Sequence, residues 1–456
     1  MRKETNPLKR LASAMIILVL AASGCGDDAA IDGDEPVDPA PAVAMDGDES
    51  SVDEGEEAQP LPVPEPSTSE DETSSTNQAA PTTEAPAELD DTTPEEPITE
   101  PIRLGAVSTL TGPASFPESH LAAQAVFDRV NAAGGIGGRM IEYIVEDDGF
   151  DPGLASQAAR RLADEEGVVA LVGSASILEC AVNAGFYAEN GLFSIQGTGI
   201  DPVCFATSNI SPVNTGPFFS DAVALYYASE ELAAENVCFG AFDVPDFQPA
   251  YAAAIAEWTA ATGKELAYSD TTLIFDGDLT PFMLELESNG CDAAVVQAND
   301  FHYVAMMQIR EAQGLDVQVI GLTSGYTEAV AEQLGPTGNG LVLASEFEPF
   351  TDLDSEVLAD WRTLMNEAGV PLTSFAEGGY LAATIMVGVL EGIEGEITRE
   401  SVAAALLGFE PVDTGLTGTP YAFGEGDAHG SNRAAKFVEL VDGEWVVKTP
   451  EWIVVP

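Results

Sequence analysis

From residue 101 onward, short continuous runs of apolar residues alternate with longer segments in which apolar residues recur every three to four positions. The short runs are typical of buried strands, and the longer spacing is typical of amphipathic helices. The expected strands are 103–107, 140–146, 168–172, 192–195, a run from 237, 271–274, a run from 292, 317–321 and 341–346. The expected helices are 121–131, 154–166, 219–234, 249–262, 303–313, 355–368 and 377–392. This alternation predicts an α/β fold with mostly parallel sheets.

The pattern occurs twice along the chain. One block of strands and helices ends before Asn214-Thr215-Gly216-Pro217, and a similar block starts after it. The apolar run 341–346 is expected to be a return strand between the two blocks. Near the C-terminus, 436–441 and 445–447 flank Asp442-Gly443, which predicts a β-hairpin. Two similar blocks in series indicate two lobes.

The N-terminal pattern is different. Basic residues at positions 2, 3, 9 and 10 precede an apolar run from Leu11 to Ala22, and small residues lead into Cys25. This layout is typical of a secretory signal peptide, expected here over 1–24, and its apolar run is too short to span a bilayer comfortably. The segment Ala22-Ser23-Gly24-Cys25 resembles the bacterial lipobox, which predicts a lipid on Cys25 and an extracytoplasmic, membrane-anchored protein. The alternative is an ordinary signal peptide that contains a cysteine.

Charge narrows the range of partners. The chain has 77 Asp and Glu against 16 Lys and Arg, a formal net charge of −61. Nucleic acid is excluded as a partner, because phosphate binding needs clustered basic residues. Residues 26–100 contain no Lys or Arg and are rich in Asp, Glu, Pro, Ser and Thr. Such a segment predicts a disordered, extended linker over 25–100, with a specific binding tail as the alternative.

Five cysteines are an odd number for a secreted protein, and a lipid on Cys25 leaves four. An even set in an oxidising compartment predicts two disulfides, for which three pairings exist. Cys180 and Cys204 flank one helix–strand unit, and Cys238 and Cys291 each lie at the start of an apolar strand. We therefore favour Cys180–Cys204 and Cys238–Cys291. The spacing of cysteines and histidines supports no metal site, and the sequence indicates no cofactor.

Motifs for catalysis are weak. Gly135-Ile136-Gly137-Gly138 follows a helix and precedes a strand, the wrong order for a dinucleotide site, so a turn is expected. The sequence contains no P-loop motif and no nucleophile elbow near a histidine and an acid, and its three histidines are expected at surface or loop positions. The run Glu146-Asp147-Asp148 is interpreted as a strand end with turn residues rather than a calcium site. A hydrolase on this scaffold is therefore disfavoured.

Small and hydroxyl-bearing residues follow three of the expected strands. These segments are 108–116, 173–176 and 196–199. Ligands bind at the carboxyl ends of parallel strands, where such loops offer hydroxyl and backbone N–H donors. Each segment alone is more typical of a helix cap. Together they predict a site for a small polar or anionic group.

Four ordered segments resemble the extracellular solute-binding proteins of branched-chain amino acid and amide ABC transporters. They are Leu110-Thr111-Gly112-Pro113, residues 130–139, Val145-Glu146-Asp147-Asp148 and residues 170–174. The resemblance covers nearly all of 102–456. It implies the type 1 periplasmic-binding-protein fold, with two doubly wound parallel-sheet lobes joined by three crossovers near 216, 345 and 420. Lobe 1 is then 101–216 plus 345–420, and lobe 2 is 217–344 plus 421–456.

The resemblance also implies site residues. It assigns the ligand carboxylate to the backbone and hydroxyls of Ser174 and Ser176, with Thr198 and Gly199 from the next loop. Aromatic positions over the ligand correspond to Phe116, to Phe247 (a Tyr in family members) and to the neighbourhood of Asn299 and Asp300. The chain departs from the family after the strand that ends at Gly321. Amino-acid binders place an acid there to hold the ligand's ammonium, and this chain has Thr323-Ser324-Gly325-Tyr326.

Asp300 or Glu377 could supply the missing charge, and Thr323 stands at the position of the absent acid. Without such a charge the ligand need not be an amino acid, so amides, short carboxylates and aromatic acids stay open. The implied function is capture of a small polar ligand by a lipid-anchored binding protein that delivers it to an ABC transporter permease, without covalent chemistry. The alternative is a surface lipoprotein that senses a ligand and signals to a membrane receptor.

Overall fold

The computed structural model describes residues 100–112, 115–244, 246–424, 426, 429 and 432–456. The expected signal peptide, Cys25 and the acidic linker lie outside these residues, apart from Glu100 at the linker's end. Their assignments therefore stay predictions. Among the described residues, no helix combines the length and the apolar character needed to cross a membrane.

The first sheet is parallel and comes from the first block of the sequence. Its order is β6-β4-β1-β3-β5-β7, with β2 paired to β1. The strands are β1 (Ile102–Ser108), β2 (Ile141–Asp147), β3 (Ala170–Val172), β4 (Ala175–Ser176), β5 (Ser194–Gln196), β6 (Thr198–Gly199) and β7 (Ile210–Pro212). Both β3 and β4 pair with β1, and the break between them contains Gly173 at a left-handed φ of 71°. The expected strands at 168–172 and 192–195 are thus each followed by a short second strand.

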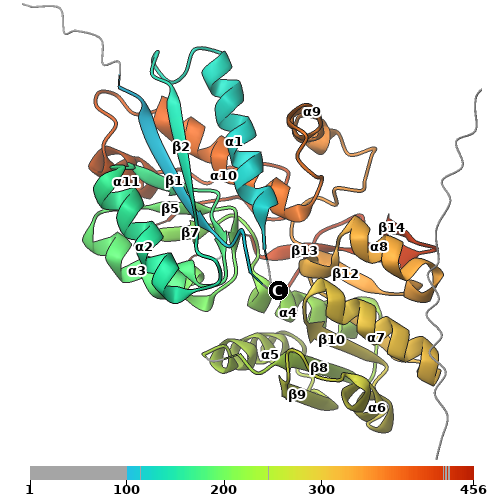
Figure 1. Ribbon diagram of the computed structural model, residues 1–456. Helices are drawn as coiled ribbons and strands as arrows, with labels where there is room; N and C mark the ends of the chain where they lie inside the picture. Colours follow the sequence, from blue (N-terminus) through green and yellow to red (C-terminus); the bar gives the residue numbers. More distant parts are fainter. Residues whose placement is uncertain (1–99, 113–114, 245, 425, 427–428, 430–431) are drawn as a thin grey trace, which may run out of the picture. The chain divides into compact units, whose positions relative to one another are not determined.

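Helices cover both faces of this sheet. One face carries α1 (Pro117–Ala132) and α10 (Ser374–Glu391), whose apolar side chains share a core with Ile102 and Leu104. The other face carries α2 (Pro152–Arg160) and α3 (Glu179–Glu189), packed around Val107 and Leu171. Although more than 240 residues separate their starts in the sequence, α1 and α10 lie side by side (Figure 1).

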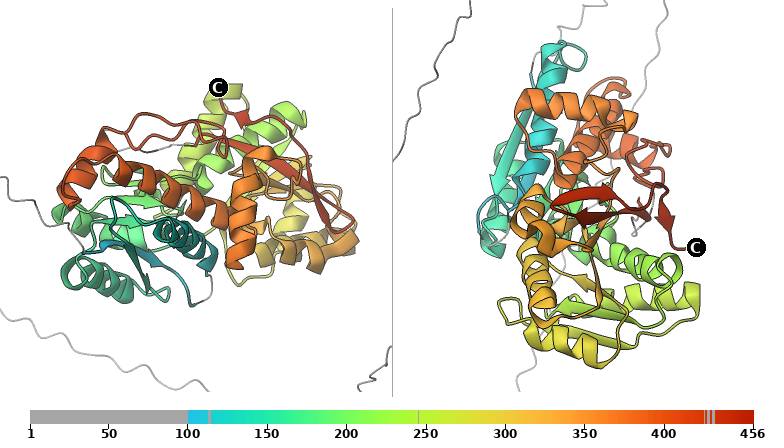
Figure 2. Two further views of the ribbon diagram at one scale, coloured as in Figure 1. Left: turned by 90° about the horizontal axis from the view of Figure 1, so that it is seen from above. Right: turned by 90° about the vertical axis from the view of Figure 1, so that its right-hand side faces the viewer.

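The second sheet has the order β14-β13-β12-β11-β10-β8-β9, with β15 paired to β13. Its strands are β8 (Val237–Phe242), β9 (Tyr268–Leu273), β10 (Ala293–Gln297), β11 (Gln318–Gly321), β12 (Val342–Ser345), β13 (Ala434–Val441), β14 (Glu444–Val447) and β15 (Ile453–Val454). Strands β8 to β12 are parallel, and β13 and β14 form the expected C-terminal hairpin, drawn in red in Figure 2. The helices around this sheet are α4 (Pro217–Tyr226), α5 (Gln248–Thr262), α6 (Thr280–Ser288), α7 (Asp300–Gln313) and α8 (Glu328–Leu334).

The chain passes between the two sheets three times. It leaves the first sheet after β7, returns after β12 to form α9 (Ala359–Ala368), α10 and α11 (Arg399–Leu407), and leaves again before β13. Because α10 packs on β3 and β5, the third pass is needed to bring β13 back to β12. Two doubly wound α/β lobes with three crossovers are the fold expected from the sequence. The exact lobe boundaries given above remain a prediction.

Several elements differ from the sequence expectation. The helix expected over 154–166 ends at Arg160 and continues as one wider helical turn, residues 161–165. The helix expected over 219–234 ends at Tyr226 and also continues as one wider turn, residues 227–231. The short helices α8 and α11 were not expected, because seven and nine residues give little periodic signal. The segment Gly135-Ile136-Gly137-Gly138 forms the expected turn, closed by an Ile136–Arg139 bridge.

Both expected disulfides are present. Cys180 on α3 joins Cys204 in the short helical turn 202–205, with Cα atoms 5.2 Å apart. Cys238 on β8 joins Cys291, with Cα atoms 5.9 Å apart. The second pairing follows from register, because β8 and β10 are adjacent parallel strands and Cys238 lies opposite Ala294. Each disulfide therefore lies within one block of the sequence.

Candidate ligand-binding site

Buried carboxyl groups support the loops at the carboxyl end of the first sheet. Asp148, which is fully buried, accepts hydrogen bonds from the hydroxyls of Thr109 and Ser176. The Ser176 hydroxyl also accepts the backbone N–H groups of Leu178 (3.0 Å) and Glu179 (2.9 Å). The Ser176 side chain therefore caps the start of α3 and holds the loop in place. Because the Ser176 hydroxyl is already bonded inside the protein, only backbone groups of Ser176 would remain for a ligand.

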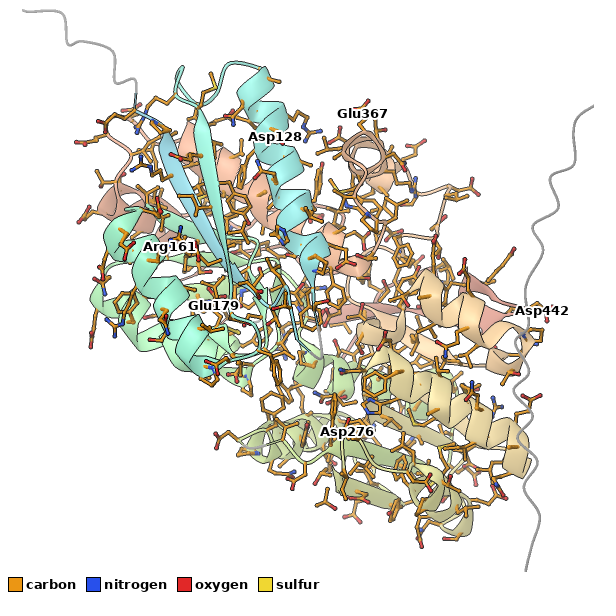
Figure 3. The ribbon with its side chains drawn as sticks, viewed as in Figure 1. Asp128, Arg161, Glu179, Asp276, Glu367 and Asp442 are labelled. Atoms are coloured by element: carbon orange, nitrogen blue, oxygen red, sulfur yellow. A yellow bond between two sulfur atoms is a disulfide. The ribbon has the colours of Figure 1, made fainter. Side chains whose placement is uncertain are left out.

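Glu179 is the second support, labelled in Figure 3 within the first block. Its carboxyl accepts Ser174 Oγ (3.3 Å), Tyr187 OH (2.9 Å) and Gln196 Nε2 (2.8 Å). Burial raises the pKa of Glu179 to about 8, although these hydrogen bonds act in the opposite direction. The Ser174 hydroxyl also accepts the N–H of Val107 at 3.2 Å. This network joins β1, α3 and β5, so the Ser174 hydroxyl is committed inside the protein.

The acidic run at the end of β2 has the turn role expected for it. The Asp147 carboxylate accepts the N–H groups of Leu110 (2.9 Å) and Gly149 (2.8 Å) and the hydroxyl of Thr111 (2.7 Å). Partial burial opposes ionisation, but these bonds outweigh it and hold the pKa of Asp147 below its usual value. Among the residues that the structure describes, no group of three or more His, Cys, Asp or Glu side chains is placed to hold a metal ion.

Thr198 and Gly199 form the next loop. The Thr198 N–H donates to Ser174 O at 3.2 Å, and the Thr198 side chain is only 4% exposed. Within the described part of the chain, the Thr198 hydroxyl has no hydrogen-bond partner. Gly199 exchanges two hydrogen bonds with the Asn214 side chain. Unlike the hydroxyls of Ser174 and Ser176, the buried hydroxyl of Thr198 is therefore not committed to a described protein partner.

The N-terminus of α10 lies against the same loops. Phe375 packs edge-on against Phe116, with ring centroids 5.2 Å apart. A Cβ atom at Gly379 would lie 1.8 Å from Ser119 O, and one at Gly378 would lie 2.2 Å from Gly197 O. Helix α10 thus touches the start of α1 and the loop before Thr198 with bare backbone. This contact brings Phe116, Thr198 and the first turn of α10 together.

Glu377 lies in that first turn and is fully buried. Neither of its carboxyl oxygens has a hydrogen-bond partner among the described residues. Burial, followed by the nearby Glu348 carboxylate, raises the pKa of Glu377 well above its usual value of 4.5. A buried carboxyl without a partner is costly, which makes it a functional candidate rather than a packing residue.

In the second lobe, Thr323 lies in the short helical turn that follows β11. The Thr323 side chain is 9% exposed, and its hydroxyl has no partner within the described ranges. Tyr326, in the same loop, donates its N–H to Thr323 O at 3.0 Å. After burial, the Glu377 carboxyl is among the groups that raise the pKa of the Tyr326 hydroxyl. The Tyr326 hydroxyl is therefore within electrostatic range of the Glu377 carboxyl.

Two expected site residues lie elsewhere in the second lobe. Phe247 is 8% exposed and packs against Phe218, 5.1 Å between centroids, and Tyr251, 6.3 Å, so it belongs to the core beside α4 and α5. Asp300 is exposed at the start of α7, where its carboxylate accepts the N–H of Phe301 at 2.7 Å. Ligand contacts by Phe247 and Asp300 remain predictions without structural support.

His302 departs from the surface or loop position expected for the histidines, because it lies buried in the first turn of α7. His302 is 3% exposed, its Nδ1 accepts the N–H of Asn299 (3.2 Å), and its Nε2 lies 2.8 Å from Phe275 O. Its ring packs against Phe242 and Phe301, 4.2 and 3.9 Å between centroids. The ring completes the cap of α7, which is a structural role that sequence spacing did not reveal.

Comparison with known proteins agrees with this architecture. Residues 101–444 match the model of the periplasmic binding protein family. The chain belongs to that family. Its relatives are solute-binding proteins and not enzymes. A leucine-, isoleucine-, valine-, threonine- and alanine-binding protein of Pseudomonas aeruginosa is 23% identical over 321 residues, which cover 67% of this chain and 82% of that protein.

Two solved structures show the same fold. One is the branched-chain amino acid transporter substrate binding protein LivJ from Streptococcus pneumoniae in complex with isoleucine, with 18% identity and a TM-score of 0.65 over 78% of this chain and 99% of that one. The other is a fatty acid ABC transporter substrate-binding protein from Thermomonospora curvata, with 20% identity and a TM-score of 0.63. That match covers 78% of this chain and 95% of the other. These two proteins are named for chemically different ligands, an amino acid and a fatty acid, so the shared fold does not determine the ligand.

The three crossovers of this periplasmic binding protein meet at Glu346, which sequence reasoning missed. Its carboxyl accepts Asn214 Nδ2 (3.1 Å) from the first crossover and Ser220 Oγ (3.0 Å) from α4. Asn432, from the third crossover, donates its side-chain N–H to the Glu346 backbone carbonyl. Burial raises the pKa of Glu346 to about 7, against the hydrogen bonds that favour its ionised form. Through Asn214 the same network reaches Gly199.

Asp221 was also missed. It lies on α4, is fully buried, and neither carboxyl oxygen has a partner among the residues described. After burial, the Asp221 charge is among the groups that raise the pKa of Tyr303, whose hydroxyl donates to Val296 O (2.8 Å) and accepts the Leu322 N–H (2.8 Å). Asp221 therefore lies near the ends of β10 and β11. The sequence feature that could have identified Asp221 as a candidate is the presence of an acidic residue within the largely apolar run 217–228.

Proposed function

We propose that this protein captures one small polar molecule, such as an amino acid, an amide or a small carboxylate, for import by an ABC transporter. The observation that carries the proposal is the buried Thr198 hydroxyl, which has no partner in the described chain and lies beside the start of α10. Similar atoms at Thr323 and Glu377 support it, and the P. aeruginosa relative is named as an amino acid-binding protein. Closure about the three crossovers would enclose the ligand.

The test is a thermal-shift screen of the purified protein against amino acids, amides and short carboxylates. A ligand at 100 times its dissociation constant stabilises the folded state by about 2.7 kcal/mol, so a shift of several degrees is expected for one class. We expect Thr198→Val to weaken that ligand roughly 10- to 100-fold without lowering the melting temperature, because the hydroxyl bonds nothing in the described protein. A screen without any shift would contradict the proposed function.

We further propose that the protein is held at the outer face of the cell membrane by a lipid on Cys25. The basic start, the apolar run and the small residues before Cys25 support this proposal. Intact-mass analysis of membrane-extracted protein is expected to find a chain that starts at an acylated Cys25. An unacylated N-terminus in that extract would contradict the anchor and leave the binding function untouched.

A further inference from the structure

We propose that Phe205 is a positioning residue for ligand capture and that the Cys180–Cys204 disulfide anchors it. Phe205 keeps Thr198 and Gly199, the two residues of β6, in a fixed place beside the first crossover. The inference rests on the proposed function, because β6 carries the Thr198 hydroxyl that is proposed above as a ligand contact. It adds a requirement for capture that lies outside the ligand contacts themselves.

The first observation is the place of the Phe205 side chain, which is half-buried at the end of the short helical turn 202–205. A Cβ atom at Gly216 would lie 2.3 Å from Phe205 Cζ, and one at Gly199 would lie 3.0 Å from the same atom. Gly199 belongs to β6, and Gly216 belongs to the first crossover, where its φ is 78°. The edge of the ring therefore lies against bare backbone of both segments and separates them like a wedge.

The second observation is that β6 is linked to all three crossovers. Gly199 exchanges hydrogen bonds of 2.9 and 3.1 Å with the Asn214 side chain in the first crossover, and Asn214 also donates to Glu346 in the second. His429, in the third crossover, donates its N–H to Phe205 O at 2.9 Å. Lobe closure moves the chain at these crossovers. Thr198 therefore needs an anchor that belongs to the first lobe alone.

The third observation is that such an anchor exists. Cys204 precedes Phe205 directly and is bonded to Cys180 in the first turn of α3, and both cysteines are fully buried. Gln196, two residues before Thr198, places its side-chain nitrogen 3.0 Å from Cys180 Sγ. Helix α3 packs on the first sheet and makes no part of a crossover. The disulfide thus fixes Phe205 to the first lobe, and Phe205 in turn fixes β6.

The second disulfide provides a natural control. Cys238–Cys291 lies near the starts of β8 and β10, whereas ligands bind at the carboxyl ends of such strands. Its cysteines are 53 residues apart in the sequence, against 24 for Cys180–Cys204. Because stabilisation by a disulfide grows with the length of the loop that it closes, loss of Cys238–Cys291 should lower the melting temperature at least as much. Global stability and positioning therefore predict opposite orders for the two disulfides.

Hydrogen–deuterium exchange of the whole purified protein, without any ligand, tests the anchor directly. We expect the peptide over residues 196–201 to exchange at least about 10-fold faster in the double variant Cys180→Ala/Cys204→Ala than in wild type, because the N–H groups of β6 lose their fixed surroundings. The double variant Cys238→Ala/Cys291→Ala should leave exchange of this peptide unchanged while lowering the melting temperature.

A second pair of variants keeps both disulfides and decides the question where a double variant fails to fold. Phe205→Leu removes the ring that touches Gly199, and it should also accelerate exchange over 196–201. Phe186→Leu is its control, because Phe186 is half-buried against the same core and packs on Tyr187, 6.2 Å between ring centroids. We expect exchange of the peptide to be unchanged in Phe186→Leu.

Titration calorimetry with L-leucine, propionamide and propionate then measures the consequence for capture. Whichever probe binds wild type should bind about 10-fold more weakly to Cys180→Ala/Cys204→Ala and to Phe205→Leu, because the ordering of β6 then opposes binding, and equally well to both controls. Unchanged exchange over 196–201, or faster exchange with unchanged affinity, overturns the inference and leaves the binding function standing. Equal losses of affinity in the controls overturn it too, since affinity would then follow stability. Faster exchange with no binding of any probe and a negative screen supports the anchor of β6 and contradicts the proposed function.

Discussion

Gly379→Ala is expected to destabilise the protein by at least about 3 kcal/mol, the largest effect we predict for a single methyl group. The added Cβ would lie 1.8 Å from Ser119 O and 2.5 Å from its carbonyl carbon, so the backbones of α1 and α10 must separate. Overpacking of this kind costs about 1–3 kcal/mol even where only side chains move, and here the obstacle is backbone. Urea denaturation monitored by circular dichroism measures the loss.

Gly388→Ala is the matched control for this prediction. Gly388 belongs to the same helix and is exposed, and a Cβ added there would meet no atom of the described residues within 4 Å. Because alanine favours a helix over glycine, this change should stabilise the protein by roughly 0.5–1 kcal/mol. The same substitution at two places on one helix is thus expected to have opposite signs. Equal stability of Gly379→Ala and wild type would contradict the close contact that holds Glu377 in place.

The second large effect is a loss of stability as pH rises, to which Glu346 contributes about 3 kcal/mol. Its pKa is raised from 4.5 to about 7 in the folded protein, so the folded state holds a proton that the unfolded chain releases more readily. The stability linked to this proton is complete below about pH 4.5 and is lost as pH rises through about 7. Glu179, whose pKa is raised to about 8 in the folded protein, likewise lowers the unfolding free energy as pH rises.

Comparison with Glu346→Gln isolates the contribution of Glu346. The variant mimics the protonated form and keeps an acceptor for Asn214 or Ser220. We expect it to match wild type at pH 4.5 and to exceed its unfolding free energy by about 3 kcal/mol at pH 8.5. Chemical denaturation at both pH values measures this difference. A Glu346→Gln variant that is less stable than wild type at pH 8.5 would show that the ionised carboxylate is the form that joins the crossovers.

The fold was largely accessible from sequence, because apolar periodicity and an ordered set of motifs carry it. Strand β8 is a continuous apolar run, β1 is apolar from Leu104 to Val107, and the pairing of Cys238 with Cys291 follows from two strand starts in parallel register. The short helix α8 and the wider turn after Arg160 were not accessible, since a few residues give little periodicity. Contacts between distant segments, such as Gly379 with Ser119, leave no local pattern at all.

The site was only partly accessible for the same reason. Hydroxyl-rich strand ends located Ser174, Ser176 and Thr198, but sequence could not tell which hydroxyls are already bonded inside the protein. Asp221 lies within an apolar helix, and its buried state follows from packing between elements far apart in the chain. Glu346 was missed because its role depends on the meeting of three crossovers. The role of each of these side chains depends on which groups it bonds in the folded protein, and the residue type alone does not reveal that.

The most direct test of capture without chemistry is native mass spectrometry of the purified protein with a ligand identified by the screen. We expect one small molecule per chain, released with its mass unchanged after prolonged incubation and unfolding. The bound fraction should fall in Thr198→Val. A chain that binds no small molecule, or that returns it chemically altered, would contradict capture without chemistry.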